Sequence, residues 1–399
     1  MSDAGVLVLN AGSSSLKFAV FRVARGGEDP SPVLQGQIAG IGAAPVLKAR
    51  MEGGESESIE IDEIDTHQKA IDYALKWIDG QTGDLSIAGV GHRVVHGGPD
   101  RRTPALVSPE LMAELDAFSR LAPHHQPHNL AAIRAVSAVA PDLPQVACFD
   151  TAFHATQPAV ARRLPLPKAL RDSGLQRYGF HGLSYEYITG AVPTVNAGHM
   201  PQRLLVAHLG NGASLCAIRD GQSVATTMGF STLDGLLMGT RSGSIDPGVL
   251  LHLMHEEHMD EAALSDLLYN RSGLLGVSGI SGDMQVLLNS DEPAAAEAVD
   301  LFCYTMVREI GSMAAALGGV DALVFTGGIG EHAAVIRRKV CEQLDWLGVA
   351  FDASANEAGG SVLTSPESPV RVLVIPTNEE LVITRHTVRL VQDIQQRAR

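Results

Sequence analysis

The sequence predicts an α/β protein made of two similar domains, each with a mixed sheet. Three observations lead to this prediction. The chain has 399 residues, which is long for a single hydrophobic core and indicates two or three domains. A strand–turn–strand pattern near the amino terminus returns in the same order in the middle of the chain. After each copy, helical patterns alternate with further short apolar strands, as in α/β domains.

The first copy lies in VLVLNAGSSSLKFAVF, residues 6–21. Its period-two alternation predicts two strands of a hairpin, at 6–9 and 16–21, joined by a loop at 11–15. The loop is rich in glycine and serine, so it offers N–H and hydroxyl donors with little bulk, and Lys17 follows it. These features make the turn a candidate anion site.

The second copy lies in LLVAHLGNGASLCAI, residues 204–218. Aligning the two copies places SSLK at 14–17 over ASLC at 213–216, so Lys17 matches Cys216 and only the first turn carries a cation. Two phosphate-binding turns that serve one triphosphate need a single lysine at the far end of its phosphates, which fits this asymmetry. The alternative is that both are ordinary hairpins whose glycines permit tight turns.

Later segments continue the α/β pattern. Apolar strands are predicted within SIAGVGHRVVHGG at 86–98 and VDALVFTGGIGEH at 320–332, and the polar segment 51–65 is expected to be a surface loop or an edge strand. The composition changes near residue 150, and the last stretch of the chain has a helical pattern. We therefore expect one domain at 1–150, completed by a helix at 385–399 that packs back on it, and a second domain at 151–384.

Composition excludes several kinds of partner. The net charge of −15 argues against binding to nucleic acid, so any anion site must be local. The four cysteines show no CxxC spacing, which fits a reducing compartment. The amino terminus does not have a signal-peptide pattern, and no run of 18 uncharged apolar residues occurs. We expect a cytoplasmic protein that does not bind a membrane.

Arginine recurs beside histidine or glycine in three segments: GHRVVHGG with Arg93, RYGFHGLSYEY with His181, and GTRSGSIDP with Arg241. Guanidinium groups bind carboxylate and phosphate oxygens bidentately, and a site that joins these two anions needs such groups to offset their repulsion. Each arginine alone also fits a surface or structural position.

Other motifs narrow the chemistry. Asp150 and Glu379 are candidate Mg²⁺ contacts, although Glu379 also suits the start of a helix. FTGGIGEH, at 325–332, runs from a strand into a helix, where backbone N–H groups can face a nucleotide. No GxxxxGK[ST] loop is present. The histidines of HLMHEEH do not have the HExxH spacing of zinc sites, so a solvated helix is expected there.

Taken together and in order, these motifs resemble the acetate kinase family. The matching segments are LVLNAGSSSLKF, GHRVVHGG, FDTAFH, RYGFHGLSY, HLGNGASL, GTRSG.IDPG, FTGGIGE and PTNEEL, from residue 7 to residue 381. The resemblance implies two ribonuclease H-like domains of the acetate and sugar kinase/actin type, with an active-site cleft between them. It also implies a homodimer and the reversible reaction of ATP with acetate to give ADP and acetyl phosphate.

The resemblance also implies roles for single residues. The catalytic set would be Arg93, Asp150, His181 and Arg241, and the metal contacts to Mg²⁺, or Mn²⁺ in its place, would be Asn10 and Glu379. Arg93, Val95, His124, Phe180 and Thr232 would line the substrate pocket. Ser15 and Lys17 would lie near the transferred phosphate. The remaining ATP contacts would be His208, Leu209, Gly210, Asn211, Gly212, Asp283, Met284, Gln285, Gly328, Ile329, Gly330, Glu331 and His332.

The acceptor leaves alternatives open. A carboxylate ionises with a pKa of about 4–5, so this nucleophile needs no strong general base, unlike the hydroxyl acceptor of a sugar kinase. His124 and Thr232 stand where the family usually has leucine and proline, and they make the pocket more polar. The alternative acceptors are therefore propionate, glycolate and lactate. A sugar or polyol kinase and an actin-type nucleotide-gated protein are the rival functions.

Overall fold

The computed structural model describes residues 4–12, 15–23, 28–83, 85–123 and 125–397, so His124 lies outside the described residues. The chain forms two compact units. Unit 1 consists of Met1–Ala152 and Asn378–Arg399, and unit 2 is Phe153–Thr377. No helix in the described part of the chain is long and apolar enough to cross a membrane.

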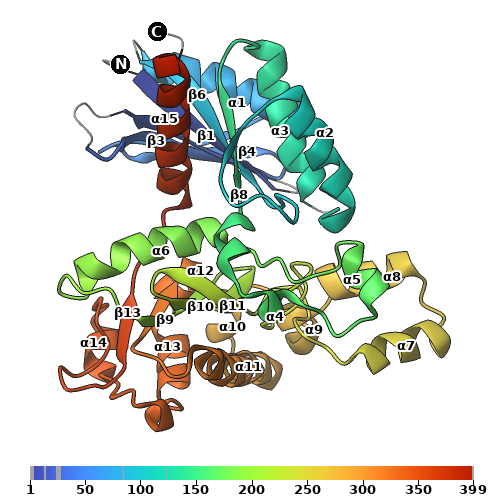
Figure 1. The fold of residues 1–399 in the computed structure, drawn as a ribbon, viewed down its shortest axis with the longest axis vertical. Helices are drawn as coiled ribbons and strands as arrows, with labels where there is room; N and C mark the ends of the chain where they lie inside the picture. The colour runs from blue at the N-terminus through green and yellow to red at the C-terminus, as the bar shows by residue number, and fades with distance from the viewer. Residues whose placement is uncertain (1–3, 13–14, 24–27, 84, 124, 398–399) are drawn as a thin grey trace. The chain divides into compact units, whose positions relative to one another are not determined.

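Unit 1 contains one sheet and its helices (Figure 1). Its strands are β1 (Ala4–Ala11), β2 (Ser15–Arg22), β3 (Ser31–Ala39), β4 (Val46–Met51), β5 (Ser56–Glu60), β6 (Ser86–Val94), β7 (Ala105–Leu106) and β8 (Gln145–Phe149). Its helices are α1 (His67–Thr82), α2 (Pro109–Ala117), the 3₁₀ turn η1 (Phe118–Leu121), α3 (Gln126–Val139) and α15 (Glu379–Arg397).

The sheet of unit 1 has the order β5-β4-β3-β2-β1-β6-β8-β7. The first five strands are antiparallel neighbours, whereas β1, β6 and β8 run parallel. The predicted opening hairpin is therefore confirmed, and the polar segment near residue 56 is an edge strand. A polar edge strand discourages pairing with other chains.

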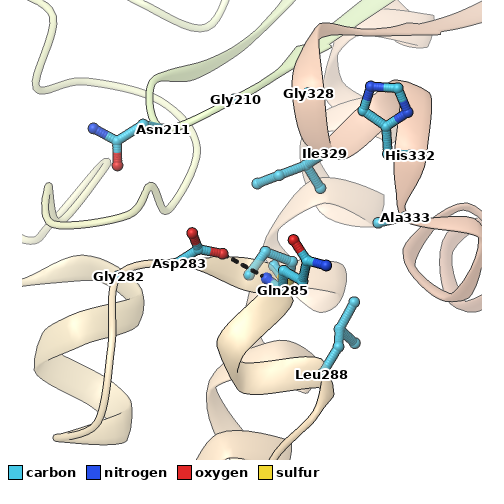
Figure 2. A pocket seen from close by; sticks show the side chains of 11 residues that line it. Gly210, Asn211, Gly282, Asp283, Gln285, Leu288, Gly328, Ile329, His332 and Ala333 are labelled. Atoms are coloured by element: carbon cyan, nitrogen blue, oxygen red, sulfur yellow. Dashed lines mark hydrogen bonds between the residues drawn. The ribbon is translucent and has the colours of Figure 1, made fainter. Parts of the chain in front are cut away.

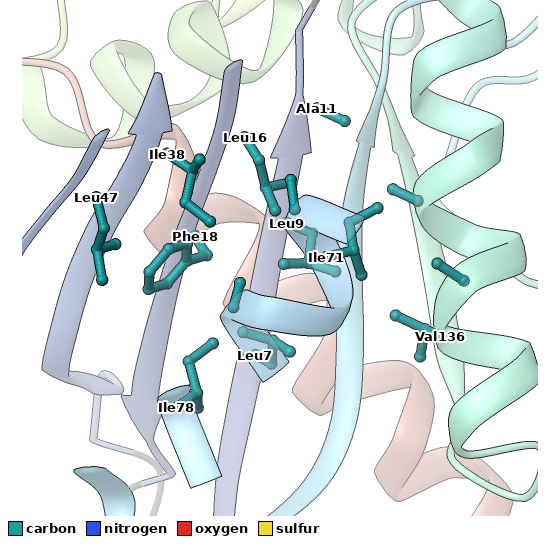
Figure 3. Close-up of a cluster of buried hydrophobic side chains, with 14 of the residues drawn as sticks. Leu7, Leu9, Ala11, Leu16, Phe18, Ile38, Leu47, Ile71, Ile78 and Val136 are labelled. Atoms are coloured by element: carbon teal, nitrogen blue, oxygen red, sulfur yellow. The ribbon is translucent and has the colours of Figure 1, made fainter. Parts of the chain in front are cut away.

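Two helices close the core on one face of this sheet. Thr66 caps α1, because its side chain accepts a hydrogen bond from the N–H of Lys69, and the apolar positions of α1 recur at helical spacing. These positions join alternate residues of the central strands and one side of α3 in a buried cluster (Figure 3). Helix α15 packs on β1, β6 and β8, and these contacts cover the opposite face.

Unit 2 repeats this plan with a smaller sheet of order β11-β10-β9-β12-β13. Its strands are β9 (Arg203–Leu209), β10 (Ala213–Arg219), β11 (Gln222–Thr226), β12 (Ala322–Thr326) and β13 (Arg371–Val374). Its helices are η2 (Ala152–Thr156, shared with unit 1), α4 (Ala159–Arg162), α5 (Lys168–Asp172), α6 (Gly182–Val195), α7 (Pro247–His255), α8 (Glu261–Asn270), α9 (Gly273–Ser278), α10 (Met284–Leu288), α11 (Pro293–Leu317), α12 (Gly327–His332), α13 (Ala334–Cys341), η3 (Asp345–Leu347) and α14 (Ala353–Glu357). Helix α6 shares a buried cluster with alternate residues of β9, β10 and β12, and α11 contacts β9, β10 and β11 (Figure 1).

The duplicated hairpin is confirmed, but one alignment within it is wrong. In β1 and β2 the second cross-strand pair from the turn is Asn10 with Lys17. In β9 and β10 it is His208 with Ser214, because the second turn is one residue shorter. The structural counterpart of Lys17 is therefore Ser214. Cys216 lies two pairs further from the turn and is fully buried.

Candidate active site

Polar side chains of unit 1 gather at the edge where its parallel strands end. Asn10 lies near the end of β1, Arg93 near the end of β6, and Asp150 directly follows β8. Lys17 reaches the same edge from β2, where it pairs with Asn10. Side chains alternate along a strand, and the residues next to these four belong to the buried clusters under α1, α2 and α3. These four residues therefore share the opposite face. The carboxyl edge of parallel strands is the usual ligand site of α/β sheets.

Helix α15 adds two carboxylates to this edge. It packs closely on β6 at Gly91, where a Cβ atom would lie 2.4 Å from Cγ2 of Ile383. This contact, one helical turn into α15, brings the first turn of the helix level with Arg93. Glu379 and Glu380 occupy that first turn, which also suits the helix dipole. The expected helix start is therefore present, and the structure adds that its carboxylates lie near Arg93.

Arg93 lies between two carboxylates. Its Nε donates to Oδ1 of Asp150 at 2.9 Å and its Nη2 to Oδ2 at 2.8 Å, which is a bidentate pair. Its Nη1 lies 3.2 Å from Oε2 of Glu379. Burial by itself lowers the pKa of the guanidinium, but the two carboxylates more than offset this and the pKa of Arg93 is raised. The guanidinium is therefore permanently charged and fixed in orientation.

The same edge can supply oxygen ligands to a hard cation. In the described ranges no three His, Cys, Asp and Glu side chains form a metal-binding group. The amide of Asn10 and the carboxylate of Glu379 are hard oxygen donors, and such a sparse set suits Mg²⁺, which keeps several waters and substrate phosphates as ligands. Burial, and next the neighbouring Glu379, raise the pKa of Glu380. Asn10 and Glu379 therefore fit a magnesium ion.

The segment after β6 is held by amide side chains of α3. Val95, expected to line the substrate pocket, donates its N–H to Oδ1 of Asn129 at 2.9 Å. The side chain of Gln126 accepts from the N–H of His96 at 3.1 Å and donates to its carbonyl at 2.9 Å. Neither amide was predicted from the sequence. The short spacing of Gln126 and Asn129, one helical turn apart after LAP, was the available signal.

In unit 2, His181 and Arg241 converge on the turn between β9 and β10. His181 is the N-cap of α6 with a left-handed φ of 58°, and its Nδ1 lies 2.8 Å from Oγ of Ser214. Tyr185 is hydrogen bonded to the same hydroxyl. A Cβ atom on Gly212 would lie 2.5 Å from Nη2 of Arg241 and 3.4 Å from Nε2 of His181. Glycine at 212 therefore lets both side chains approach the backbone of the turn.

Arg241 differs from Arg93 in its surroundings. Its Nη1 donates to the carbonyl of Thr232 at 2.8 Å. In the part of the chain that the structure describes, no carboxylate forms an ion pair with it, and burial lowers its pKa to about 10. A half-buried cation that pairs with a neutral carbonyl is poorly compensated, which favours the binding of an anion there.

A series of side-chain contacts runs from His181 through α6, beginning with a ring stack and continuing through hydrogen bonds. The rings of His181 and His208 stack with centroids 4.3 Å apart. Nδ1 of His208 lies 2.8 Å from Oγ of Ser184, and that hydroxyl lies 2.9 Å from Oγ1 of Thr377. The N–H of Thr377 donates to Oε1 of Glu331 at 3.1 Å. The contacts orient both rings.

Unit 2 also contains a cavity of about 660 Å³. The turn between β9 and β10, the start of α10 and the helix α12 contribute its walls (Figure 2). The lining residues are Gly210, Asn211, Gly282, Asp283, Met284, Gln285, Leu288, Gly328, Ile329, His332 and Ala333. None of these is a lysine or arginine, and the carboxylate of Asp283 accepts the N–H of Gln285 at 2.8 Å as the cap of α10. The lining suits an uncharged group better than a chain of phosphates.

Most of the expected ATP contacts in unit 2 lie around this cavity, and the others have different surroundings. His208 and Gly212 lie beside His181, while Leu209 and Gly330 are buried in β9 and α12. Glu331 is engaged within unit 2, because its Oε1 also accepts the N–H of Gly327 at 2.8 Å.

The remaining expected residues are spread over both units. Phe180, expected to line the substrate pocket, is buried beside His181, and Thr232 is also buried. Ser15 is the first residue of β2, and its carbonyl accepts the N–H of Gly12 at 2.8 Å. Three lining residues were not predicted from the sequence, although each lies beside or one turn from an expected residue: Gly282, Leu288 and Ala333.

Comparison with known proteins identifies the family. A family model described as the acetokinase family matches residues 5–385. The chain is 51% identical to an acetate kinase of Rhodopseudomonas palustris over 394 residues, covering 98% of this chain and 99% of that protein.

Solved structures give the same result. The crystal structure of an acetate kinase from Porphyromonas gingivalis matches with a TM-score of 0.87 and 36% identity, over 97% of this chain and 100% of that one. A propionate kinase from Francisella tularensis matches with a TM-score of 0.90 and 32% identity, over 97% and 99%. The expected two-domain fold of the acetate and sugar kinase/actin type is thereby confirmed. This chain belongs to the acetokinase family.

Proposed function

We infer that this chain transfers the terminal phosphoryl group of ATP reversibly to acetate, giving acetyl phosphate and ADP. The observation that carries this conclusion is the 51% identity to an acetate kinase over 98% of the chain. The match to a propionate kinase is at 32% identity, so acetate is favoured over the larger acids. The family assignment likewise excludes the sugar kinase and the actin-type protein.

The reaction needs little acid–base chemistry. A carboxylate oxygen of acetate forms a bond to the γ-phosphorus, while the bond from that phosphorus to the β–γ bridging oxygen breaks and its electron pair leaves with ADP. Acetate is already ionised at neutral pH, so no proton has to be removed. The protein must instead bring two anions together and stabilise the charge on the equatorial phosphoryl oxygens.

We propose that Arg93 binds the acetate carboxylate and the migrating phosphoryl group. Its bidentate pair with Asp150 supports this role, because the pair fixes the guanidinium before substrate arrives. Both oxygens of Asp150 are engaged with Arg93, so Asp150 orients the arginine instead of acting as a base. Val95, two residues further along, lies beside the methyl group.

In unit 2, we propose that Arg241 and His181 donate to the transferred phosphoryl group. The uncompensated charge of Arg241 and the convergence of both side chains on Gly212 support this role. The cavity beside Gly210 holds the nucleoside, since its lining is uncharged apart from Asp283. The glycine-rich turn between β9 and β10 then carries the phosphates, and Ser15 and Lys17 of unit 1 contact the transferred end.

We propose that Asn10 and Glu379 hold Mg²⁺, with water and phosphate oxygens as the other ligands. Mn²⁺, which takes similar ligands, is expected to replace it. When bound, the ion neutralises charge on the phosphate oxygens. The chain's own contribution is Lys17, which pairs with Asn10 in the sheet and adds a second positive charge at this edge.

We also propose a homodimer that acts in the cytoplasm, where ATP is available. Helix α7 supports the dimer, because none of its residues is buried although most are apolar. Leu251 is 68% exposed and Met254 is 50% exposed. An apolar helix with no buried face is typical of a protein interface.

One assay tests the central conclusion. The purified protein is incubated with ATP, Mg²⁺, hydroxylamine and either acetate, propionate, glycolate or lactate, and the hydroxamate of each acid is measured. We expect acetohydroxamate, with the highest kcat/KM for acetate. If another acid has a higher kcat/KM, that acid is the preferred substrate instead of acetate. If no acid yields a hydroxamate, the proposed function is refuted.

A further inference from the structure

Asn129 of α3 joins the ends of two neighbouring strands. Its Oδ1 accepts the N–H of Val95 at 2.9 Å, and its Nδ2 donates to the carbonyl of Ala11 at 2.7 Å. Ala11 ends β1, and Val95 directly follows β6. The side chain is almost completely buried, at 2% exposure. One amide therefore satisfies a donor on one strand and an acceptor on the other.

The position of this amide matters because the ladder between the strands ends just before it. The last registered pair of β1 and β6 is Leu9 with His92. Ala11 and Val95 lie beyond that pair, so Asn129 links the strands where backbone pairing between them has stopped. Asn10 directly precedes Ala11, and Arg93 lies two residues before Val95. The link thus joins the two strands one residue beyond the proposed magnesium contact and two residues beyond the proposed carboxylate contact.

The next carbonyl of the same turn is held in a similar way. Nε2 of His67, in α1, lies 2.6 Å from the carbonyl oxygen of Gly12. Two consecutive carbonyls, of Ala11 and Gly12, are therefore engaged by side chains of the helices on one side of the sheet. A carbonyl that is engaged in this way does not turn towards a bound phosphate, where it would repel the anion.

We propose that Asn129 is a positioning residue for the reaction, which sets the spacing between Asn10 and Arg93 by joining Ala11 to Val95. It acts through these two backbone groups and contacts no substrate. The proposal rests on the proposed function of the edge. It predicts that loss of the link weakens the binding of acetate and Mg²⁺ together, because the two contacts belong to different strands whose ends, beyond the ladder, are joined by this amide.

Gln145 provides a matched control. It is a buried amide of the same sheet, with its Oε1 2.7 Å from Nε2 of His92 and its Nε2 donating to Oγ of Ser137 at 2.8 Å. It begins β8, at the amino edge of the parallel strands, whereas Asn129 acts at their carboxyl edge. Replacing Gln145 removes one buried and one partly buried hydrogen bond, whereas replacing Asn129 removes two buried ones. Asn129 joins β1 to the residue after β6, next to Asn10 and Arg93, and Gln145 does not contact β1 through these bonds.

The experiment compares Asn129→Ala with Gln145→Ala in the full-length protein. Both are expected to lower Tm, because both leave buried polar groups unsatisfied. For Asn129→Ala we expect the KM for acetate and the half-saturating Mg²⁺ concentration to rise at least about tenfold each, with the KM for ATP within about threefold. Gln145→Ala should change none of these constants by more than about twofold. Equal constants for the two variants would overturn the proposal.

Asn129→Asp gives a second test that holds even where the alanine variant does not fold. The introduced carboxyl can accept from Val95, but it donates to the carbonyl of Ala11 only when protonated. We expect its deficit relative to the native protein to shrink as pH falls from 8 to 5.5, whereas Gln145→Glu should show no such recovery in kcat/KM for acetate. A deficit that does not change with pH would contradict the proposal. Native protein that forms no acetohydroxamate would instead refute the proposed function itself.

Discussion

Replacing Asp150 with asparagine tests whether this carboxylate orients Arg93 or removes a proton. In the structure Asp150 accepts two hydrogen bonds from the guanidinium, at 2.9 and 2.8 Å, and its side chain is 2% exposed. An asparagine in its place keeps one acceptor and loses the charge. Glu379 remains 3.2 Å from the guanidinium and continues to compensate it. The variant therefore removes about one charge-assisted hydrogen bond from an otherwise intact site.

A hydrogen bond to a charged group contributes about 1.5–3 kcal/mol. Since about 1.4 kcal/mol corresponds to a tenfold change in rate, Asp150→Asn should lower kcat/KM for acetate by roughly 10- to 150-fold. The hydroxamate assay, run at saturating ATP and Mg²⁺ between pH 5.5 and 9, measures this change. Asp116→Asn is the control, because Asp116 also accepts from an arginine, through Nη2 of Arg134, but is 48% exposed. It should change kcat/KM by less than about twofold.

The pH profile separates the two roles. If Asp150 only orients Arg93, the variant loses activity by the same factor across the range, because no proton is transferred to it. If Asp150 is a general base, the loss exceeds about 1,000-fold and any decline of the native rate towards acid pH disappears in the variant. That second result would refute the proposed mechanism. A loss smaller than about threefold would also refute it, since Arg93 would then need no partner.

Three further predictions concern other parts of the chain. Arg241→Lys keeps a cation but loses the planar guanidinium, whose two terminal nitrogens reach Thr232 and Gly212. Turnover should therefore fall at least about 100-fold, while ATP affinity, measured by calorimetry, should change less than about threefold. His92 is buried, and desolvation lowers its pKa to about 4. Below pH 6.5 the folded protein therefore binds fewer protons than the unfolded chain, so its stability falls as the pH falls from 6.5 towards 4. In His92→Gln, denaturation at pH 6.5 and at pH 5 should show this loss reduced by about 2 kcal/mol. An unchanged loss would contradict the neutral buried imidazole. Leu251→Glu on exposed α7 should convert the dimer to monomers in light scattering without lowering Tm, whereas a variant that remains dimeric would exclude this helix as the interface.

Elements with a strong local pattern could be predicted from the sequence. The alternation in residues 6–21 and 204–218 fixed both hairpins, because a strand with one face on the core shows its period in the sequence. The helix at the carboxyl end followed from its apolar spacing. The close packing of α15 on β6 could not be predicted. Gly91 leaves room for this helix, which is apparent only once the helix that contacts it is known.

Single site residues could be predicted where the residue type itself indicates the chemistry. Contacts between two site residues were much less predictable. Arg93 and Asp150 were identified separately, but their pairing joins positions 57 residues apart and depends on β6 and β8 being neighbours. Apart from its spacing from Gln126, Asn129 gave no signal, because an asparagine in a helix fits a cap, a surface position or a buried bridge equally well. Only the placement of two backbone groups beyond the end of a ladder distinguishes these cases.

The duplicated hairpins show how one framework supports two different chemistries. The second cross-strand pair from the turn occupies the same position in both hairpins: it is Asn10 with Lys17 in the first and His208 with Ser214 in the second. Because the side-chain period of a strand is two, a pair at this position faces the same side of its sheet in each unit, away from the α1 and α3 core in unit 1 and towards α6 in unit 2. The first pair supplies an oxygen and a cation, and the second supplies an imidazole and the hydroxyl that orients His181. A lysine in place of Ser214 would remove the contact that holds His181, so the second hairpin cannot carry the cation that Lys17 supplies in the first.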